Sequence, residues 1–594
     1  MPTFPSLQEN STSVEMLSSF GGYNHNERIS DNEFYDETNL SSNAYPVASV
    51  RPQRCTVQTL TKPNGMLAKD ALAWIDGTSI FYNGKDITVS TLGGKGLTLS
   101  DTQKTLVSMG AYLLIWPDKY YINTEDYSDC GSMENAVETG NLDEAHAVNF
   151  AICKADGSDY GSITTSDTAP SDPQNGAVWL DTSGEVHALK QYSSAAGMWV
   201  SIATTYVRIS FPGIGAGFEK YDGVQISGCT AKGTEEFNGS HILYDVKDNY
   251  IVIVGLLDQA IGQEDGEIKV TRLVPDMDFV TEAQNRIWGC KYGVVDGKTV
   301  NEIYCCALGD FKNWEKYLGI SSDSYRASVG TDGVWTGAVT HLGYPMFFKE
   351  NCFHKVYVST SGAHQIVDTQ CRGVQKGSSR SMAIVNEVLY YKGRTGIMAY
   401  DGALPQEVGT QLGGERYYNA VGGVFGNKYF CAMTDTDGKH HLFVFDTQHQ
   451  IWHKEDGLQV RAFAKCDDEL YAMTDKEIIG MNGIGMNGLG TPEEKVKWAA
   501  ELATVGYDTP DRKYLSRFNL RLKLPADSYM DIHIQYDSSG EWEYQGRIYG
   551  AGDRTFMLPV RPRRCDHCQI QLSGEGTMQL FSLSRIRENG SDVE

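Results

Sequence analysis

Short apolar runs separated by tight turns dominate the chain, and the clearest example lies between Tyr417 and Gly457. Three clear apolar runs and a weaker first one follow one another there, at 421–425, 428–433, 441–445 and 450–453. The breaks between them carry Gly, Asn and Asp, which adopt positive φ or hydrogen-bond their own backbone, so they predict tight turns. Four short strands joined by such turns predict an antiparallel meander, the unit that forms one blade of a β-propeller.

The same rhythm recurs along the chain, as a propeller requires, because a single blade cannot bury both of its faces. Counting the first example, there are seven candidate units, the others lying at 71–87, 106–122, 279–290 with 303–314, 344–358, 382–402 and 461–481. No strict residue motif repeats, so we expect a propeller of six to eight blades. One or more ordinary β-sandwiches are the alternative interpretation of the pattern.

Interruptions of this rhythm divide the chain into domains. We expect an N-terminal arm and propeller entry at 1–55, the first portion of the propeller at 56–127, inserted small β-modules at 128–275, the second portion of the propeller at 276–482, a Gly-rich linker at 483–494, and a C-terminal β-sandwich or jelly-roll-like domain at 495–594. Seven strand-like runs in the last ~100 residues favour the sandwich. The expected fold class is therefore all-β.

Length and composition agree with this class. The 594 residues exceed what one core accommodates, and 62 Gly and 33 Tyr with few helical periodic patterns favour strands and turns. No apolar run approaches the ~20 residues of a membrane helix, and the N-terminal sequence lacks the basic and apolar regions of a signal peptide. The 13 Cys are an odd number spread along the chain, which predicts reduced thiols that mostly fill the core.

The charge balance argues against a nucleic-acid-binding protein. Net charge is −25, with 76 acidic against 51 basic residues, whereas a duplex-binding protein needs a basic footprint to neutralise phosphates. Solubility of a large β protein is a sufficient reason for the acidity. A channel wall that repels DNA and lets it slide past is a second one, and the sequence leaves both open.

Two stretches of the chain contain recognisable sequence features. One lies between Phe20 and Arg54, and the other lies near the end of the chain. The first set comprises Asn24, Ile29, Glu33-Phe34, Asn39-Leu40, Tyr45-Pro46 and Arg51-Pro52. The second is Leu558 to Arg585, which contains Arg563-Arg564-Cys565-Asp566. Together they resemble the opening and closing segments of the β-propeller tail proteins of tailed phages, known as nozzle or tail-hub stabilisation proteins. The resemblance covers both ends and the middle rhythm, without a single diagnostic motif.

The resemblance implies a structural virion protein in the tail or neck. Such a protein would form a homo-oligomeric ring, of six copies, around the channel through which DNA leaves, and would act in tail assembly and genome delivery. Its partners would be copies of itself and other tail, adaptor or portal proteins, while DNA passes without specific binding. The chain would be made in the bacterial host cytoplasm and reside in the virion.

Motifs that carry catalytic or metal chemistry are scarce. The pair Cys565 and Cys568 supplies two of the four ligands that a structural zinc site needs, so we expect core thiols and no metal or other cofactor. The glycines of 480–491 lack the Lys-Ser/Thr of a phosphate-binding loop. No serine-hydrolase, metalloprotease or EF-hand motif is present, so we expect no catalytic residue and no enzyme.

The strongest local basic cluster is the run formed by Arg561, Arg563 and Arg564. A phosphate contact is one interpretation, and a salt-bridged interface with acidic partners is the favoured one. The alternative function for the whole chain is a tail-tip propeller that binds or degrades host-surface carbohydrate, because exposed aromatic rings and carboxylates could face a sugar.

The charge balance generates a prediction about DNA. We expect no measurable binding of the purified protein to duplex DNA at physiological salt, because −25 of net charge opposes approach. Fluorescence anisotropy of a labelled duplex over a salt series measures this. Binding tighter than about micromolar with a steep salt dependence would show a basic face of the right shape for DNA.

Overall fold

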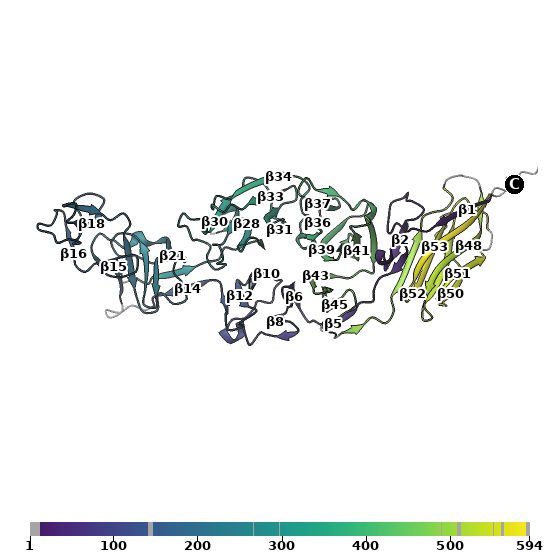
Figure 1. The fold of residues 1–594 in the computed structure, drawn as a ribbon, viewed down its shortest axis with the longest axis horizontal. Helices are drawn as coiled ribbons and strands as arrows, with labels where there is room; N and C mark the ends of the chain where they lie inside the picture. Colours follow the sequence, from purple (N-terminus) through teal and green to yellow (C-terminus); the bar gives the residue numbers. More distant parts are fainter. Residues whose placement is uncertain are drawn as a thin grey trace, which may run out of the picture.

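The computed structural model describes residues 12–140, 147–264, 266–295, 297–486, 488, 490–507, 512–550, 552–559 and 563–589. Within these ranges the regular elements are β-strands and short 3₁₀ turns, with no α-helix and hence no helix able to cross a membrane. Figure 1 shows three bodies in a row, with an inserted β body at one end, a propeller in the middle and a sandwich at the other end. The all-β prediction is confirmed.

The middle body is a propeller of seven blades, each built on an antiparallel sheet of four or more short strands. The first three blades are β6 (Pro63–Ala68), β7 (Leu72–Asp76), β8 (Ser79–Tyr82) and β9 (Lys85–Asp86); β10 (Thr105–Met109), β11 (Tyr112–Trp116), β12 (Tyr120–Asn123) and β13 (Cys130–Ser132); and β27 (Phe279–Glu282), β28 (Ile287–Val295), β29 (Lys298–Cys305) and β30 (Tyr325–Ser328). The next three are β31 (Gly337–His341), β32 (Tyr344–Phe348), β33 (Cys352–Tyr357) and β34 (Gln365–Gln370); β35 (Ala383–Val385), β36 (Val388–Lys392), β37 (Ile397–Tyr400) and β38 (Gln406–Glu407); and β39 (Tyr417–Phe425), β40 (Lys428–Asp435), β41 (His440–Asp446) and β42 (Ile451–Glu455).

The seventh blade closes the ring by joining distant stretches of the chain. It contains β43 (Val460–Cys466), β44 (Glu469–Thr474) and β45 (Glu477–Gly480), followed by β5 (Cys55–Thr59) and β46 (Thr491–Pro492). The N-terminal β5 pairs antiparallel with β45, so that Gln58 faces Ile478. A strand from the start of the propeller therefore fastens its last blade.

Each pair of neighbouring blades in the described chain encloses one cluster of buried apolar side chains. Successive side chains of a strand point to opposite faces, so one strand serves two clusters. In β11, for example, Leu113 and Ile115 pack toward the first blade, and Leu114 and Trp116 pack toward the third. This is why both faces of a blade are apolar, and it confirms the expectation of six to eight blades.

The insertion between β13 and β27 folds as one body with a single core. Its sheets are β14 (Asn135–Glu138), β26 (Lys269–Arg272), β21 (Gly223–Ser227) and β22 (Gly239–Ile242); β23 (Asp245–Lys247), β24 (Tyr250–Val254), β20 (Tyr206–Ser210), β15 (Val148–Cys153) and β25 (Ile261–Glu264); and β16 (Ile163–Ser166), β17 (Val178–Asp181), β18 (Ala188–Ser193) and β19 (Met198–Ser201). Phe150, Leu180 and Ile226 come from the three different sheets and meet in one buried cluster. The inserted β-modules thus support one another.

The third body is a sandwich of two antiparallel sheets. One sheet has the order β2 (Phe34–Thr38), β47 (Lys497–Leu502), β52 (Cys568–Glu575), β49 (Tyr529–Tyr536) and β50 (Glu543–Tyr549). The other has the order β3 (Leu40–Ser41), β4 (Ala48–Val50), β53 (Gln579–Asn589), β48 (Lys513–Leu524) and β51 (Gly552–Pro559), with β1 (Thr12–Leu17) also paired to β53. Side chains of both inner faces, such as Leu520 and Ile570, form one core.

The structure places the N-terminal segment differently from our expectation of an arm that leads into the propeller. Strands β1 and β4 pair with β53 of the sandwich, β2 pairs with β47 and β3 pairs with β4, so the chain enters the propeller only at β5. The physical reason is that a sandwich strand with an open edge exposes unpaired backbone groups, which these short strands cover.

The segment expected to be a Gly-rich linker is also held against the propeller. The Glu469 carboxylate accepts hydrogen bonds from the amides of Asn482 and Ile484, at 2.7 and 2.8 Å. The Tyr471 hydroxyl donates to the Gly485 carbonyl at 3.0 Å. The short 3₁₀ turns that complete the structure are η1 (Ser42–Ala44), η2 (Leu92–Lys95), η3 (Glu235–Phe237), η4 (Ser379–Ser381) and η5 (Thr410–Leu412).

Strand β48 offers a matched test of the sandwich core. Leu520 is fully buried and its neighbour Arg521 is exposed on the opposite face. We expect Leu520→Ala to lower the free energy of unfolding of the sandwich by about 2–5 kcal/mol, because it removes packed atoms and leaves a cavity. Urea unfolding followed by tryptophan fluorescence measures the change. Arg521→Ala is the control, and an equal loss in both variants would contradict the assignment of faces.

Candidate functional site

The basic residues predicted to form an interface lie on the segment between β51 and β52. Arg561 falls outside the described residues, while Arg563 and Arg564 are exposed. Arg563 forms an ion pair with Glu543, and its guanidinium lies 5.1 Å from the centre of the Tyr536 ring. Arg564 makes no ion pair with any described residue. Whether this segment contacts another protein stays a prediction.

The two cysteines of the C-terminal segment lie together in the sandwich core. Cys565 and Cys568 are both buried, and the Cys565 thiol donates to the Lys513 carbonyl at 3.5 Å. A hydrogen bond between the two thiols lowers the pKa of Cys565 and raises that of Cys568. Among the described residues no group of three or more His, Cys, Asp or Glu is arranged to hold a metal ion.

The most extensive polar structure lies where the N-terminal segment crosses from the sandwich to the propeller. The backbone of this segment adds to β42 of the sixth blade: Tyr23 N–H donates to the Trp452 carbonyl at 2.7 Å and Asn39 N–H to the Lys454 carbonyl at 2.9 Å. We call the side chains around this crossing the junction network, defined by Glu37, Arg51, Arg54, His453, Glu455, Asp456 and Glu493.

Two arginines form the centre of the junction network. Arg51, only 2 % exposed, donates to both carboxylate oxygens of Glu493 at 2.9 and 3.0 Å and to Asp456 at 3.3 Å. Arg54 donates to Glu455 at 2.6 Å. Burial alone would lower the pKa of Arg51, but the hydrogen bond with Glu493 and the surrounding carboxylates outweigh it and raise that pKa. Arg51 therefore stays charged, and the two arginines tie the N-terminal segment to the sixth blade and to residue 493.

A second contact of the same network pairs histidine with a carboxylate. His453 of β42 lies 2.7 Å from the Glu37 carboxylate of β2, and both side chains are almost fully buried. The same carboxylate oxygen accepts from the Lys454 amide at 3.1 Å. Glu37 thus joins a sandwich strand to the outer strand of a blade.

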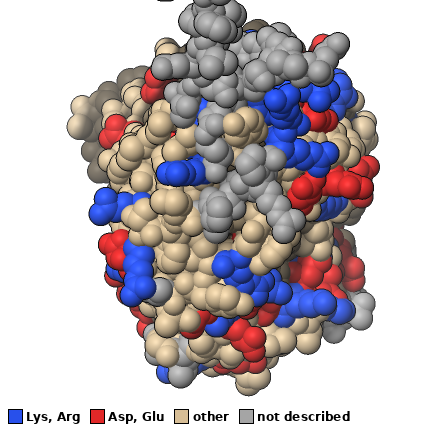
Figure 2. Space-filling model, turned by 90° about the vertical axis from the view of Figure 1, so that its right-hand side faces the viewer, with Lys and Arg blue, Asp and Glu red and all other residues tan. Residues whose placement is uncertain are grey.

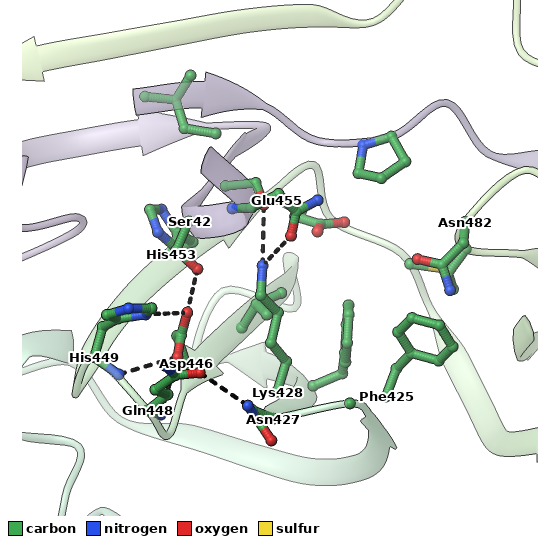
Figure 3. Close-up of a pocket in the computed structure, with 18 residues that line it drawn as sticks. Ser42, Phe425, Asn427, Lys428, Asp446, Gln448, His449, His453, Glu455 and Asn482 are labelled. Atoms are coloured by element: carbon green, nitrogen blue, oxygen red, sulfur yellow. Dashed lines mark hydrogen bonds and ion pairs between the residues drawn. The ribbon is translucent and has the colours of Figure 1, made fainter. Parts of the chain in front are cut away.

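A cavity of about 330 Å³ opens beside the junction network (Figure 3). Lys428 of β40 points toward the N-terminal segment, and its Nζ donates to Asn43 at 2.6 Å and to Ser41 at 3.1 Å. Burial lowers the pKa of this lysine. Asp446 lies between Ser42 and His449, accepting at 2.5 and 3.0 Å.

The charge state of Asp446 follows from these contacts. Burial by itself would raise the pKa of Asp446, but the hydrogen bonds from Ser42 and His449 outweigh it and lower the pKa. Asp446 therefore stays ionised, and its contact with Ser42 holds the turn η1 against the sixth blade. The cavity is thus lined by side chains that already bind one another across the junction.

The centre of the propeller holds a larger cavity, of about 670 Å³, lined by the inner strands of the blades. Arg380 lies there and donates to the carbonyls of Arg461 and Lys104, at 2.8 and 3.1 Å. The Gln103 side-chain oxygen, in the amide orientation that satisfies both groups, accepts from the same guanidinium. Burial, and then the charge of Arg461, lowers the pKa of Arg380. Arg380 therefore links three blades across the channel by hydrogen bonds.

Carboxylates near the channel are engaged in local contacts. Asp118 forms an ion pair with the buried Lys104 at 2.8 Å, and Asp278 forms one with Lys291 at 2.9 Å. Glu282 accepts from the Asn285 amide at 2.9 Å. The lining of this cavity thus combines Arg380 with the carboxylates of Asp278 and Glu282 and with apolar side chains such as Phe279 and Phe463.

Sequence reasoning missed the junction network although it named one of its members. Arg51 entered only as a member of the set that carries the resemblance, and its partners Asp456 and Glu493 lie some 400 residues away along the chain. The available signal was the pair Arg51 and Arg54 beside two prolines, in a segment otherwise rich in polar residues.

Comparison with known proteins gives a likeness in fold only. No family model and no curated protein matches the chain. Among solved structures, an exo-β-1,3-galactanase from Phanerochaete chrysosporium is 9 % identical and covers 52 % of this chain and 94 % of its own, with a TM-score of 0.22. AztD from Citrobacter koseri is 9 % identical and covers 86 % and 99 %, with a TM-score of 0.25. A Trypanosoma rangeli sialidase is 8 % identical and covers 66 % and 86 %, with a TM-score of 0.19.

These matches correct the expectation that the chain is no enzyme. That expectation rested on missing sequence motifs, yet glycoside hydrolases and a sialidase are among the solved structures that match. The absence of the motifs we searched for therefore does not exclude catalysis in this fold. At such identities and TM-scores the likeness assigns no reaction and no catalytic residue to this chain.

Replacement of Arg51 in the junction network should lower the free energy of unfolding far more than replacement of the exposed Arg563. We expect Arg51→Ala to lower the free energy of unfolding by about 3 kcal/mol, because it removes a buried guanidinium together with its charged hydrogen bonds to Glu493 and Asp456. Arg51→Lys should recover only a fraction of the loss, because an ammonium cannot form the two parallel bonds to Glu493. Thermal and urea unfolding measure both variants.

The control for this comparison is Arg563→Ala, which also removes an arginine from an ion pair but at an exposed site. Its effect should stay within about 0.5 kcal/mol. A loss of the same size for Arg51→Ala would contradict the stabilising role of the junction network.

Proposed function

We propose that this chain is a structural protein of a tailed-phage virion that forms a section of the tail or neck. Six copies would form a ring around the channel through which DNA leaves, in contact with other tail, adaptor or portal proteins. The protein would be made in the bacterial host cytoplasm and act in tail assembly and genome delivery.

The observation that carries this proposal is the junction network. A protein that transmits contacts between neighbouring components needs bodies that keep a fixed relative geometry. Arg51 and Arg54 are buried and joined to carboxylates of the propeller and of residue 493, and β2 runs beside β42. Such a charge cluster is retained only when all of its members are in place, so it favours one arrangement of sandwich and propeller.

The charge balance supports passage of DNA without capture. A net charge of −25 leaves few cations to neutralise phosphates, and each phosphate contact would add counterion release and slow movement. DNA would therefore pass through the ring lumen without specific binding.

The second candidate function is a tail-tip propeller that binds or degrades host-surface carbohydrate. The observation that favours it is the central cavity of about 670 Å³, a size typical of small-ligand sites, with Arg380 at its centre. A sugar with an anionic group facing Arg380 and hydroxyl groups facing Asp278 and Glu282 is the ligand class that this cavity would accept.

Electron microscopy of the purified protein separates the two functions. We expect closed rings of six copies with an open lumen, together with a hexamer mass by light scattering, because structural tail components work as assembled walls. Monomers that bind a glycan array, with binding lost in Arg380→Gln, would instead support the carbohydrate function and overturn the structural one.

A further inference from the structure

The outer face of the six-stranded sandwich sheet carries a row of cations. In β48, Phe518, Leu520 and Leu522 point into the core, so the alternate residues Arg517, Arg521 and Lys523 point outward and are exposed. This alternation is the strand period of two, and it sets the three cations on one face.

These three cations have no ion-pair partner among the described residues. Other arginines of the sandwich do: Arg547 binds Asp531 at 2.6 Å, and Arg585 binds Asp31 at 2.7 Å. Across the sheet, Arg521 faces Thr555 and Ser582, which are neutral. Lys523 faces Asp553 and Gln579 without forming an ion pair to the aspartate. Among the described residues, the charge of this row is therefore largely uncompensated.

Exposed apolar side chains flank the row. Val14 and Met16 of β1 are each 66 % exposed, and Met557 of β51 is 63 % exposed. Register places Met16 beside Ser584 and Met557 beside Asn519 on the same outward face. Figure 2 looks onto this end of the molecule and shows several separate patches of Lys and Arg among uncharged residues, with Asp and Glu beside some of them. Arginine with apolar neighbours is the composition enriched at protein interfaces.

The charges of the chain are distributed unevenly between its bodies. Residues 495–594 contain 14 Lys and Arg against 14 Asp and Glu, so the whole surplus of −25 lies in residues 1–494. The insertion, residues 128–275, contains 8 Lys and Arg against 21 Asp and Glu. It lies at the opposite end of the molecule from the sandwich (Figure 1). The cationic sheet face and the most acidic body of one chain are thus too far apart to meet.

We propose that the outer face of β1, β53, β48 and β51, which we call the cationic sheet face, docks on the acidic insertion of a second copy of this chain. Charge complementarity identifies the occupant, because the insertion holds the densest acidic surplus in the chain. The contact joins two different surfaces, and such heterologous contacts generate rings when the rotation between copies closes. This inference rests on the ring of the proposed function and names the surfaces that build it.

A charge-swap experiment tests the proposal. Variant one carries Arg517→Glu, Arg521→Glu and Lys523→Glu on the cationic sheet face. Variant two carries three reversals at exposed carboxylates of the insertion, Glu235→Lys, Glu236→Lys and Asp258→Lys. The control carries Lys85→Glu, Lys95→Glu and Lys439→Glu, which change the net charge as variant one does but at exposed sites of the propeller. Circular dichroism confirms the fold of each.

Sedimentation velocity at low salt gives the readout. We expect wild type and control to assemble, and each variant alone to weaken assembly by at least about tenfold in apparent dissociation constant. An equimolar mixture of the two variants should assemble again, because each reversed surface then meets an oppositely charged one. Assembly of wild type should weaken as salt rises toward about 1 M.

Three outcomes would overturn the inference, and they are distinguishable. Wild type and variant one that assemble alike would reject the cationic sheet face while leaving the proposed ring intact. Wild type that stays monomeric at low salt would reject both. Duplex DNA binding tighter than about micromolar, abolished in variant one but kept in the control, would make nucleic acid the occupant of this face.

Discussion

The arrangement of the bodies depends on one buried set of charges. Taking Arg51, Arg54 and Glu455 out of water costs several kcal/mol per ion, and their contacts with one another and with the partly exposed Asp456 and Glu493 offset this cost. The offset requires residues of the N-terminal segment, the sixth blade and the segment near 493 to meet in one geometry. The positions of the propeller, the sandwich and the segment that crosses between them therefore depend on one another. Loss of one charged partner leaves the remaining charges of the network without their full set of contacts.

The local elements could be predicted from the sequence because strands and turns are encoded over a few residues. Apolar alternation and Gly, Asn or Asp turns gave all seven blade positions, and the same signals gave the seven strands of 495–594. Long-range pairings left no such signal. The outer strand β5 of the seventh blade lies more than 400 residues from its partner β45, and β3 is only two residues long.

The same contrast between local and long-range signals applies to the functional surfaces. The contiguous run from Arg561 to Arg564 stood out in the sequence, yet Arg563 is already paired within its chain. The cations of β48 were overlooked because Phe518, Leu520 and Leu522 separate them in sequence, although that alternation is what sets them on one face. The central cavity is formed by strands from all around the ring, so no single stretch of the sequence predicts it.

The closing of the seventh blade by β5 also bears on how the protein is made. Strand β5 leaves the ribosome early, but its partner β45 is synthesised about 420 residues later, on the order of half a minute or more at ordinary translation rates. Strands β1, β2 and β4 wait still longer for their partners β47 and β53. During that interval the first blades and several unpaired strand edges stay open to other chains. Slow translation, crowding or premature termination would therefore favour aggregation, and a holding chaperone on the nascent chain would raise the yield of folded protein.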